Sequence, residues 1–210
     1  MSKRPKPSLP IIRRLPRYHR FLKALKLRGV ERVSSKELAG MMNIGSSQIR
    51  QDFNFFGGFG LQGYGYNVDL LLSEISDILG IQNHAGMILI GAGNLGRVLA
   101  RNMDFSACGF ELYGIFDNSD KVIGKKFGGF VTLDIADLEK FCEEKSPSAA
   151  VLCIPKESAQ PLVERLIKNG IQGFWNFSHY DISVSHSDIF VENVHLGDSL
   201  MSLSFIMKGK

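Results

Sequence analysis

Three glycines at a fixed spacing carry the clearest chemical signal in the sequence. Gly91, Gly93 and Gly96 follow the apolar run 87–90 and precede an apolar helical pattern. In a strand–turn–helix setting the first glycine permits a tight turn, the second lets the backbone approach a pyrophosphate, and the third lets the helix pack on the strand. The N-terminus of such a helix attracts an anion through its unpaired N–H groups and positive dipole end. The predicted phosphate-binding residues are Gly91, Ala92, Gly93, Asn94, Leu95 and Gly96.

An acidic residue at the end of a second apolar run supports this interpretation. The glycine pattern alone also fits a loop in some other α/β protein, but the run 110–116 ends on Asp117. A carboxylate there can accept both ribose hydroxyls, and its charge repels a 2′-phosphate, so NAD(H) is favoured over NADP(H). The spacing from the glycines is somewhat longer than the roughly 20 residues usual for this acid, which predicts one extra loop before the second strand.

The elements around the glycine turn alternate between strand and helix patterns. Apolar runs 148–154 and 171–177 flank a helical pattern that starts at Pro155. Such alternation predicts a parallel sheet with helices on both faces, a Rossmann-type α/β domain over residues 81–190. Ligands bind at the carboxyl ends of parallel strands. Pro155 and Asn176 lie at two of these ends, so we expect them to contact the far half of the dinucleotide, unless their loops are ordinary connections.

Charge is distributed unevenly along the 210 residues, a length that allows one large domain or two small ones. The first 60 residues hold thirteen Lys and Arg against three Asp and Glu, a formal +10, whereas the remainder carries −6 and the whole chain +4. A basic first third joined to an acidic remainder is typical of a nucleic-acid-binding module attached to another kind of domain. A basic solubilising tail is the alternative, but these charges continue through predicted helices.

Residues 1–80 show the pattern of a winged helix-turn-helix domain. A helix is predicted from Pro16, a short helix opens at the capping box Ser34–Glu37, and a turn at 43–45 leads to a third helix. The side chains of this third helix predicted to face inward are Ile49, Phe53 and Phe56. Arg, Gln and Asn side chains on its other faces suit a DNA major groove. The predicted DNA-contacting residues there are Ser46, Ser47, Gln48, Arg50, Gln51 and Asn54.

The segments on either side of these helices are also predicted to reach DNA. Residues 1–15 combine three prolines with basic residues, which favours an extended arm whose Arg14 can follow the phosphate backbone. The run 57–66 alternates glycines with aromatic residues and favours a small hairpin, the wing. The wing glycines expected to approach a minor groove are Gly58, Gly60 and Gly63. A hairpin that only packs beneath the helices is the alternative.

The last segment, residues 191–210, contains a helix that is apolar on more than one side. One face carries Leu196, Leu200, Leu203 and Met207, and other faces carry Met201, Phe205 and Ile206. Such a helix needs burial on both sides. We therefore predict a homodimer in which this helix is swapped onto the partner, and a two-fold dimer also suits a palindromic DNA site. A monomer that packs the helix on its own sheet is the alternative.

The composition disfavours several other classes of protein. No stretch approaches the roughly 18 apolar residues of a membrane span, and no apolar run follows the basic N-terminus as in a signal peptide. Three widely spaced cysteines, Cys108, Cys142 and Cys153, predict core thiols in a reducing cytoplasm rather than a disulfide or a metal site. We therefore expect a cytoplasmic protein that binds no metal.

These motifs, in this order, resemble those of the Rex family of redox-sensing transcriptional repressors. The resemblance spans nearly the whole chain, and the linked pattern from Gln48 to Val68 is its most specific part. The matching motifs are Arg14-Leu15-Pro16, Ser34-Ser35-x-x-Leu38-Ala39, Gln48-Ile49-Arg50-x-Asp52, Phe56-Gly57, Gly63-x-Gly65-Tyr66-x-Val68, Gly91-x-Gly93-x-x-Gly96, Gly114-x-Phe116-Asp117, Val191-Glu192-Asn193-Val194 and the terminal helix. The resemblance implies a homodimeric repressor that binds double-stranded operator DNA when NADH is scarce and releases it when NADH rises.

Several positions depart from the family pattern. Gln51 and Asn54 differ from the residues common in the third helix, so the base preference is expected to differ. His195 stands where family members often have an acid that pairs with a basic residue of the first helix, for which Arg20 is the nearest match. Because a neutral histidine cannot make that charge pair, coupling between the domains is expected to be weaker or to depend on other contacts. Ser178-His179 replaces the usual Ala-Pro, which is expected to shift contacts with the nicotinamide.

Two other classes of function remain as alternatives. An NAD-dependent oxidoreductase needs a substrate domain and a His–Asp or Tyr–Lys pair beside the glycine turn, and the sequence offers neither. We therefore predict no enzymatic activity, with His179 and His186 as ordinary loop histidines. The second alternative is a DNA-binding regulator that senses another nucleotide, such as NADP(H) or a coenzyme A derivative, although Asp117 argues against NADP(H).

Overall fold

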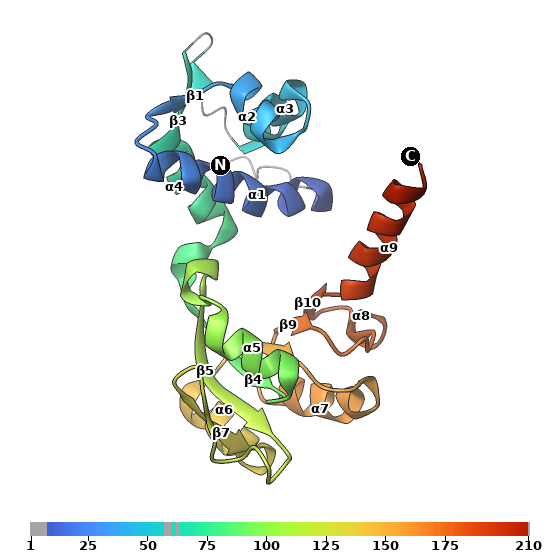
Figure 1. Ribbon diagram of the computed structural model, residues 1–210. Coiled ribbons are helices and arrows are strands. Elements are labelled where there is room, and N and C mark those ends of the chain that lie inside the picture. The colour runs from blue at the N-terminus through green and yellow to red at the C-terminus, as the bar shows by residue number, and fades with distance from the viewer. Residues whose placement is uncertain (1–7, 57–59, 62–63, 210) are drawn as a thin grey trace. The chain divides into compact units, whose positions relative to one another are not determined.

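The computed structural model describes residues 8–56, 60–61 and 64–209, which form two compact units (Figure 1). The first unit ends at Gln82 and the second begins at Asn83, two residues beyond the boundary expected from the sequence. The terminal segment 191–210 belongs to the second unit. The assignment of 1–80, 81–190 and 191–210 to DNA binding, NAD(H) binding and dimerisation stays a prediction.

The first unit combines helices with a small antiparallel sheet of strand order β1-β3-β2. A single apolar cluster joins side chains from all of its helices. The elements described in this unit are α1 (Leu9–Leu27), β1 (Arg32–Val33), α2 (Ser35–Met42), α3 (Ser46–Phe56), β2 (Gly60–Leu61), β3 (Gly65–Asn67) and α4 (Val68–Leu79), followed at the boundary by the 3-10 turn η1 (Ile81–Asn83).

Helix α1 starts earlier than the sequence predicts. It begins at Leu9, so the predicted start at Pro16 is wrong, and so is the extended arm from Leu9 onward. Pro10 lies in the first turn, where its missing N–H has no intrahelical partner to lose. Pro16 lies inside the helix, and burial of the neighbouring Leu15 and Tyr18 in the core favours continuous helix despite one missing hydrogen bond.

The caps and turns predicted for this unit are confirmed. Ser34 Oγ accepts the N–H of Glu37 at 3.1 Å, and Glu37 Oε2 accepts the N–H of Ser34 at 2.7 Å, which completes a capping box. Asn43 ends α2 in the left-handed conformation at φ 51°, at the start of the predicted turn. The side chains of α3 predicted to face inward are buried: Ile49, Phe53 and Phe56.

A short hairpin follows α3, as the glycine and aromatic alternation predicts. Gly60 pairs with Tyr66 and Leu61 pairs with Gly65 across β2 and β3. Gly58 and Gly63 of the predicted wing, and residues 1–7 of the predicted arm, lie outside the residues that the structure describes.

The second unit is built on a seven-stranded sheet in its described part, with strand order β10-β9-β8-β4-β5-β7-β6. All neighbouring strands are parallel except β6 and β7. The order reverses at β4, so the crevice at its carboxyl end is the topological switch point where ligands bind in such sheets. The elements are β4 (Ala85–Ile90), α5 (Asn94–Asn102), η2 (Ser106–Cys108), β5 (Phe110–Asp117), β6 (Lys126–Phe127), β7 (Phe130–Asp134), η3 (Ile135–Asp137), α6 (Leu138–Lys145), β8 (Ala149–Leu152), α7 (Lys156–Lys168), β9 (Gly173–Asn176), α8 (Ile182–Ser185), β10 (Phe190–Asn193) and α9 (Leu196–Lys208).

Helices cover both faces of this sheet, which confirms the predicted layers. One apolar cluster joins α6, α7 and α8 to Ile88 and Ile90 of β4. Another joins Ala100 of α5 to Met87 and Leu89 of the same strand. Because successive strand residues point to opposite faces, the two clusters lie on opposite sides of the sheet. The extra loop predicted before the second strand is present as the 3-10 turn η2.

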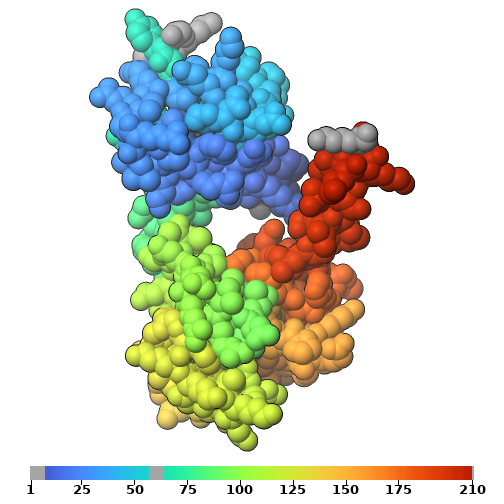
Figure 2. Space-filling model, in the orientation of Figure 1, coloured from blue at the N-terminus to red at the C-terminus, as the bar shows by residue number. Residues whose placement is uncertain are grey.

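Helix α9 stands apart from the rest of the second unit, as Figure 2 shows in red. Within the described chain, each of its residues from Leu196 to Lys208 is exposed. Its large exposed apolar side chains are Leu196, Leu200, Met201, Leu203, Phe205, Ile206 and Met207. Within the described residues of the second unit, the apolar surface predicted on several sides of this helix is therefore left uncovered.

The cysteines follow the expectation of core thiols only in part. Cys142 is buried, and burial raises the pKa of the half-buried Cys153 to about 12. Cys108 is exposed, so that expectation is wrong for this residue. The described residues contain neither a helix long and apolar enough to cross a bilayer nor a group of three His, Cys, Asp or Glu side chains placed to hold a metal ion.

Candidate functional sites

The glycine turn between β4 and α5 has the geometry that phosphate binding requires. Gly91 adopts φ +98°, and a Cβ there would lie 2.4 Å from the carbonyl oxygen of Cys153. A Cβ on Gly96 would lie 1.9 Å from the carbonyl oxygen of Gly91, so only glycine lets α5 pack this closely on the strand. Gly93 is exposed, and no described heavy atom lies within 4 Å of the Cβ it lacks. The middle glycine therefore leaves open space in front of the helix N-terminus, where an anion fits.

The carboxylate of Asp117 holds this turn to the end of the neighbouring strand. Its Oδ2 accepts the N–H of Ala92 at 2.6 Å, and its Oδ1 accepts the N–H of Ser119 at 2.9 Å. A carboxylate has about four acceptor sites, so capacity remains for the hydroxyls of a ribose. Asp117 therefore has a structural task in holding the turn, and the ribose binding expected from the sequence stays a prediction.

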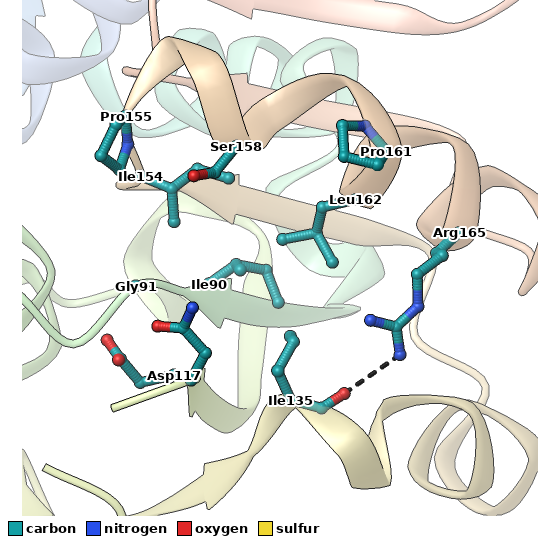
Figure 3. Close-up of a pocket in the computed structure, with 11 residues that line it drawn as sticks. Ile90, Gly91, Asp117, Ile135, Ile154, Pro155, Ser158, Pro161, Leu162 and Arg165 are labelled. Atoms are coloured by element: carbon teal, nitrogen blue, oxygen red, sulfur yellow. Dashed lines mark hydrogen bonds between the residues drawn. The ribbon is translucent and has the colours of Figure 1, made fainter. Parts of the chain in front are cut away.

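A cavity of about 250 Å³ opens beside Asp117 at the carboxyl ends of the strands (Figure 3). Its walls are mostly apolar, and Arg165 closes one side by donating to the Ile135 carbonyl at 3.1 Å and to Glu139 at 2.8 and 2.9 Å. A mostly apolar cavity next to an acid suits an aromatic base joined to a ribose. The lining residues are Ile90, Gly91, Asp117, Asn118, Ile135, Ile154, Pro155, Ser158, Pro161, Leu162 and Arg165.

The structure brings most of the predicted nucleotide residues to one place. Gly91, Asp117 and Pro155 line the cavity, and residues 92–96 form the adjoining turn and the first turn of α5. The Asn94 Oδ1 accepts a hydrogen bond from Arg97 at 2.9 Å. The cavity residues from η3 and α7 carry no motif, so the sequence patterns do not predict Ile135, Leu162 and Arg165.

Asn176 has a different environment from the one expected. It is fully buried, and its Nδ2 donates to the Tyr180 carbonyl and to Asn193 Oδ1, both at 2.8 Å. Its Oδ1 accepts from the backbone N–H of Ser178 at 3.0 Å and from its hydroxyl at 2.6 Å. The side chain therefore ties β9, β10 and the following loop together, and its contact with a dinucleotide stays a prediction.

In the first unit, a buried carboxylate joins α1 to α3. Asp52 accepts hydrogen bonds from Arg14 at 2.6 and 2.8 Å, from Tyr18 at 2.7 Å and from Gln48 at 2.9 Å. Burial would raise the pKa of Asp52, but these hydrogen bonds outweigh it and hold the pKa below its ordinary value. Burial and the bond to Asp52 raise the pKa of Tyr18, and the same carboxylate raises that of Arg14.

The other predicted DNA-contacting residues form an open polar surface on α3. Ser47, Arg50, Gln51 and Asn54 are exposed, while Ser46 is half-buried. Arg50 donates to the hydroxyl of Ser35 at 3.3 Å. The sequence signal for the Asp52 network is its place on the buried stripe, three residues after Ile49 and one before Phe53.

Two histidines meet at the base of α9. The Nδ1 atoms of His179 and His195 are 2.7 Å apart while the ring centroids are 4.8 Å apart, so the nitrogen-bearing edges face each other. In a hydrogen bond between these atoms one Nδ1 donates and the other accepts, and the tautomers decide which does so. The expectation that His179 is an ordinary loop histidine stays a prediction. Arg20 is exposed on α1 of the other unit, and its pairing with His195 stays a prediction.

Comparison with known proteins covers both units. Residues 7–54 match the family described as "Putative DNA-binding protein N-terminus", and residues 82–180 match the family described as "CoA binding domain". The Redox-sensing transcriptional repressor Rex of Clostridioides difficile is 48% identical over 201 residues, covering 96% of this chain and 95% of the relative. That of Thermoanaerobacter pseudethanolicus is 47% identical over 205 residues, covering 98% and 91%.

Solved structures of a Rex-family repressor also match this chain. The crystal structure of RSP in complex with β-NAD+ and operator DNA superposes with a TM-score of 0.90 at 44% identity, covering 98% of this chain and 94% of that chain. The complex of RSP with β-NADH gives a TM-score of 0.88 at 41% identity, covering 98% and 96%.

The fold and sites define a two-domain α/β protein that joins a helix-turn-helix unit with a small sheet to a Rossmann-type unit. The chain belongs to the Rex family of redox-sensing transcriptional repressors. The resemblance inferred from its motifs is confirmed.

Proposed function

We propose that this protein is a redox-sensing transcriptional repressor that binds double-stranded operator DNA through its first unit, binds NAD(H) through its second, and releases DNA as NADH rises. The observation that carries the proposal is the presence, in one chain, of a basic helix-turn-helix and a glycine turn backed by an acid. The RSP complexes with operator DNA, β-NAD+ and β-NADH support it. The curated relatives are named repressors, which supports regulation rather than catalysis.

NAD(H) is held by groups that the second unit places at one end of its sheet. The N–H groups of residues 93–96 bind the pyrophosphate, and Asp117 binds a ribose and disfavours a 2′-phosphate. The apolar slot lined by Ile154 and Leu162 takes the adenine. The two redox forms differ in charge at the nicotinamide, so discrimination needs a water-poor apolar environment around that ring.

The exposed helix α9 supports a homodimer. Seven large apolar side chains on several of its sides are exposed in the described part of the second unit. A second apolar cavity of about 510 Å³, lined by Phe105, Phe174 and Trp175 among others, adds uncovered surface on the same unit. We infer that a second copy covers α9, and a two-fold dimer matches a palindromic operator.

The proposed switch is an equilibrium between a DNA-binding arrangement of the dimer and a released one. A ligand shifts such an equilibrium only through its different affinity for the two arrangements, and a change from 1:99 to 99:1 needs about 5.5 kcal/mol. Two sites per dimer share this requirement. The switch acts in the cytoplasm, where the nicotinamide pool and the DNA meet.

Ligand-dependent melting of the full-length protein tests the ligand assignment. NADH and NAD+ should raise the melting temperature more than NADPH or coenzyme A at equal concentration, because binding to the native state alone stabilises it. A larger shift with coenzyme A would transfer the sensor role to that ligand, and no shift with NADH would exclude the proposed one.

A further inference from the structure

Helix α3 buries a carboxylate on a face that is otherwise apolar. The Asp52 side chain is 1% exposed and lies between Ile49 and Phe53 on the face that packs in the core. A buried ion pair is often no more stabilising than apolar residues of the same volume. Stability alone therefore does not account for a charge at this position.

The donors that converge on Asp52 include two of the residues predicted to contact DNA. Arg14 donates through Nε and Nη2 at 2.6 and 2.8 Å, a two-pronged contact that fixes the plane of its guanidinium. The remaining Nη1 is turned away from the carboxylate, and the Arg14 side chain is 26% exposed. Asp52 thus holds one edge of the Arg14 guanidinium, and the Nη1 atom on the other edge can donate to a second acceptor.

The same carboxylate fixes which end of the Gln48 amide faces away from it. Asp52 Oδ1 accepts from Gln48 Nε2 at 2.9 Å. Because an ionised carboxylate only accepts, it would repel the amide oxygen, so Gln48 Oε1 points elsewhere. A glutamine that reads adenine accepts from one base atom and donates to another, and its orientation decides which bases it can read.

We propose that Asp52 is a positioning residue for DNA recognition, which holds the Arg14 guanidinium and the Gln48 amide in the orientation in which they contact DNA. This inference rests on the proposed function of the first unit. Long side chains lose rotamer freedom on binding, and fixing them beforehand reduces that loss. Asp52 itself stays out of contact, since it is buried and its charge would repel phosphate.

The direction in which Asp52→Asn changes DNA affinity distinguishes a positioning role from a simple effect of net charge. Removal of a negative charge beside DNA strengthens binding if only net charge matters. Loss of positioning instead weakens binding to a specific duplex, roughly 5- to 100-fold. The matched control is Asp69→Asn, the same charge change at an exposed ion pair with Lys26, 2.8 Å long, on α4. This control should strengthen DNA binding, as the change in net charge predicts.

Binding is measured with the full chain by fluorescence anisotropy, on a duplex that the wild type selects from a random-sequence pool and on random DNA. We expect Asp52→Asn to lower the ratio of specific to random affinity, and to have a smaller effect in a Gln48→Ala background because the two side chains act together. The melting shift caused by NADH, which reports on the second unit, should stay unchanged.

A second variant keeps the test decisive if Asp52→Asn does not fold. Arg14→Lys preserves both charges but cannot form the two-pronged contact, so it should also weaken the selected duplex. Equal or tighter binding of the selected duplex by folded Asp52→Asn, additive effects with Gln48→Ala, or unchanged binding by Arg14→Lys would overturn the inference. If the wild type selects no duplex, the proposed function is wrong, and this inference with it.

Discussion

An alanine at Gly93 separates the structural and binding roles of the glycine turn. Its Cβ would have no described heavy atom within 4 Å, and the backbone φ of −70° suits any residue. At Gly96, by contrast, a Cβ would lie 1.9 Å from the carbonyl oxygen of Gly91. We therefore expect Gly93→Ala to fold normally and Gly96→Ala to disrupt the turn.

The expected magnitudes differ between stability and affinity. Gly93 is the N-cap of α5, where alanine is a poorer residue, so the free energy of unfolding should fall by at most about 1 kcal/mol. The added methyl occupies the surface that a pyrophosphate approaches. Loss of one hydrogen bond to this charged group, about 1.5–3 kcal/mol, corresponds to at least roughly a tenfold loss of NADH affinity.

Calorimetric titration with NADH and thermal unfolding of the same samples measure both quantities. The matched control is Gly40→Ala, another exposed glycine with no described heavy atom within 4 Å of its missing Cβ, in α2 of the other unit. The control should bind NADH as the wild type does. Wild-type NADH affinity in a folded Gly93→Ala protein would refute the role assigned to the turn.

Three further predictions concern other parts of the molecule. The pKa of Asp52 is lowered in the folded protein, so its contribution to stability is present above the ordinary value of about 3.9 and is lost as pH falls through the folded pKa. Thermal unfolding measured from pH 7 to 3 should therefore show a steeper loss of stability with falling pH in the wild type than in Asp52→Asn. The double change Leu200→Asp and Phe205→Asp on exposed α9 should weaken self-association about a hundredfold, measured by sedimentation, without loss of helix in circular dichroism. The control Val184→Asp, at an equally exposed site on α8, should leave self-association unchanged. An unchanged dimer in the double variant would rule out α9 as the interface. His195→Asp, which restores the acid common in the family, should increase the NADH-dependent change in DNA affinity by up to about fivefold. A decrease would show that the contact between His195 and His179 couples NADH binding to DNA release.

Local chemistry in the sequence predicts much of this fold. The capping box at Ser34 and the glycine turn from Gly91 to Gly96 each require one conformation, and each is found. Apolar periodicity predicts α3 and the central strands. Pro16 misleads because a proline is a strong local signal, whereas the burial of Leu15 and Tyr18 that overrides it is a tertiary effect.

Other features depend on contacts that no motif encodes. The hairpin of β6 and β7 is too short for a periodic signal, and Arg165 of α7 lines the cavity while it donates to Glu139 of α6. The hydrogen bonds of Asp52 and Asn176 join residues far apart in sequence or loop geometry that periodicity does not describe. For these side chains, residue type predicts polarity but not partner.

Titration of a preformed complex of the protein and its selected duplex with NADH and, separately, with NAD+ measures redox-dependent release of DNA. Fluorescence anisotropy of the labelled duplex should fall to the value of free DNA as NADH saturates, while NAD+ at the same concentration leaves most of the complex intact. Retention of the duplex at saturating NADH, or equal release by both forms, would contradict redox-dependent release.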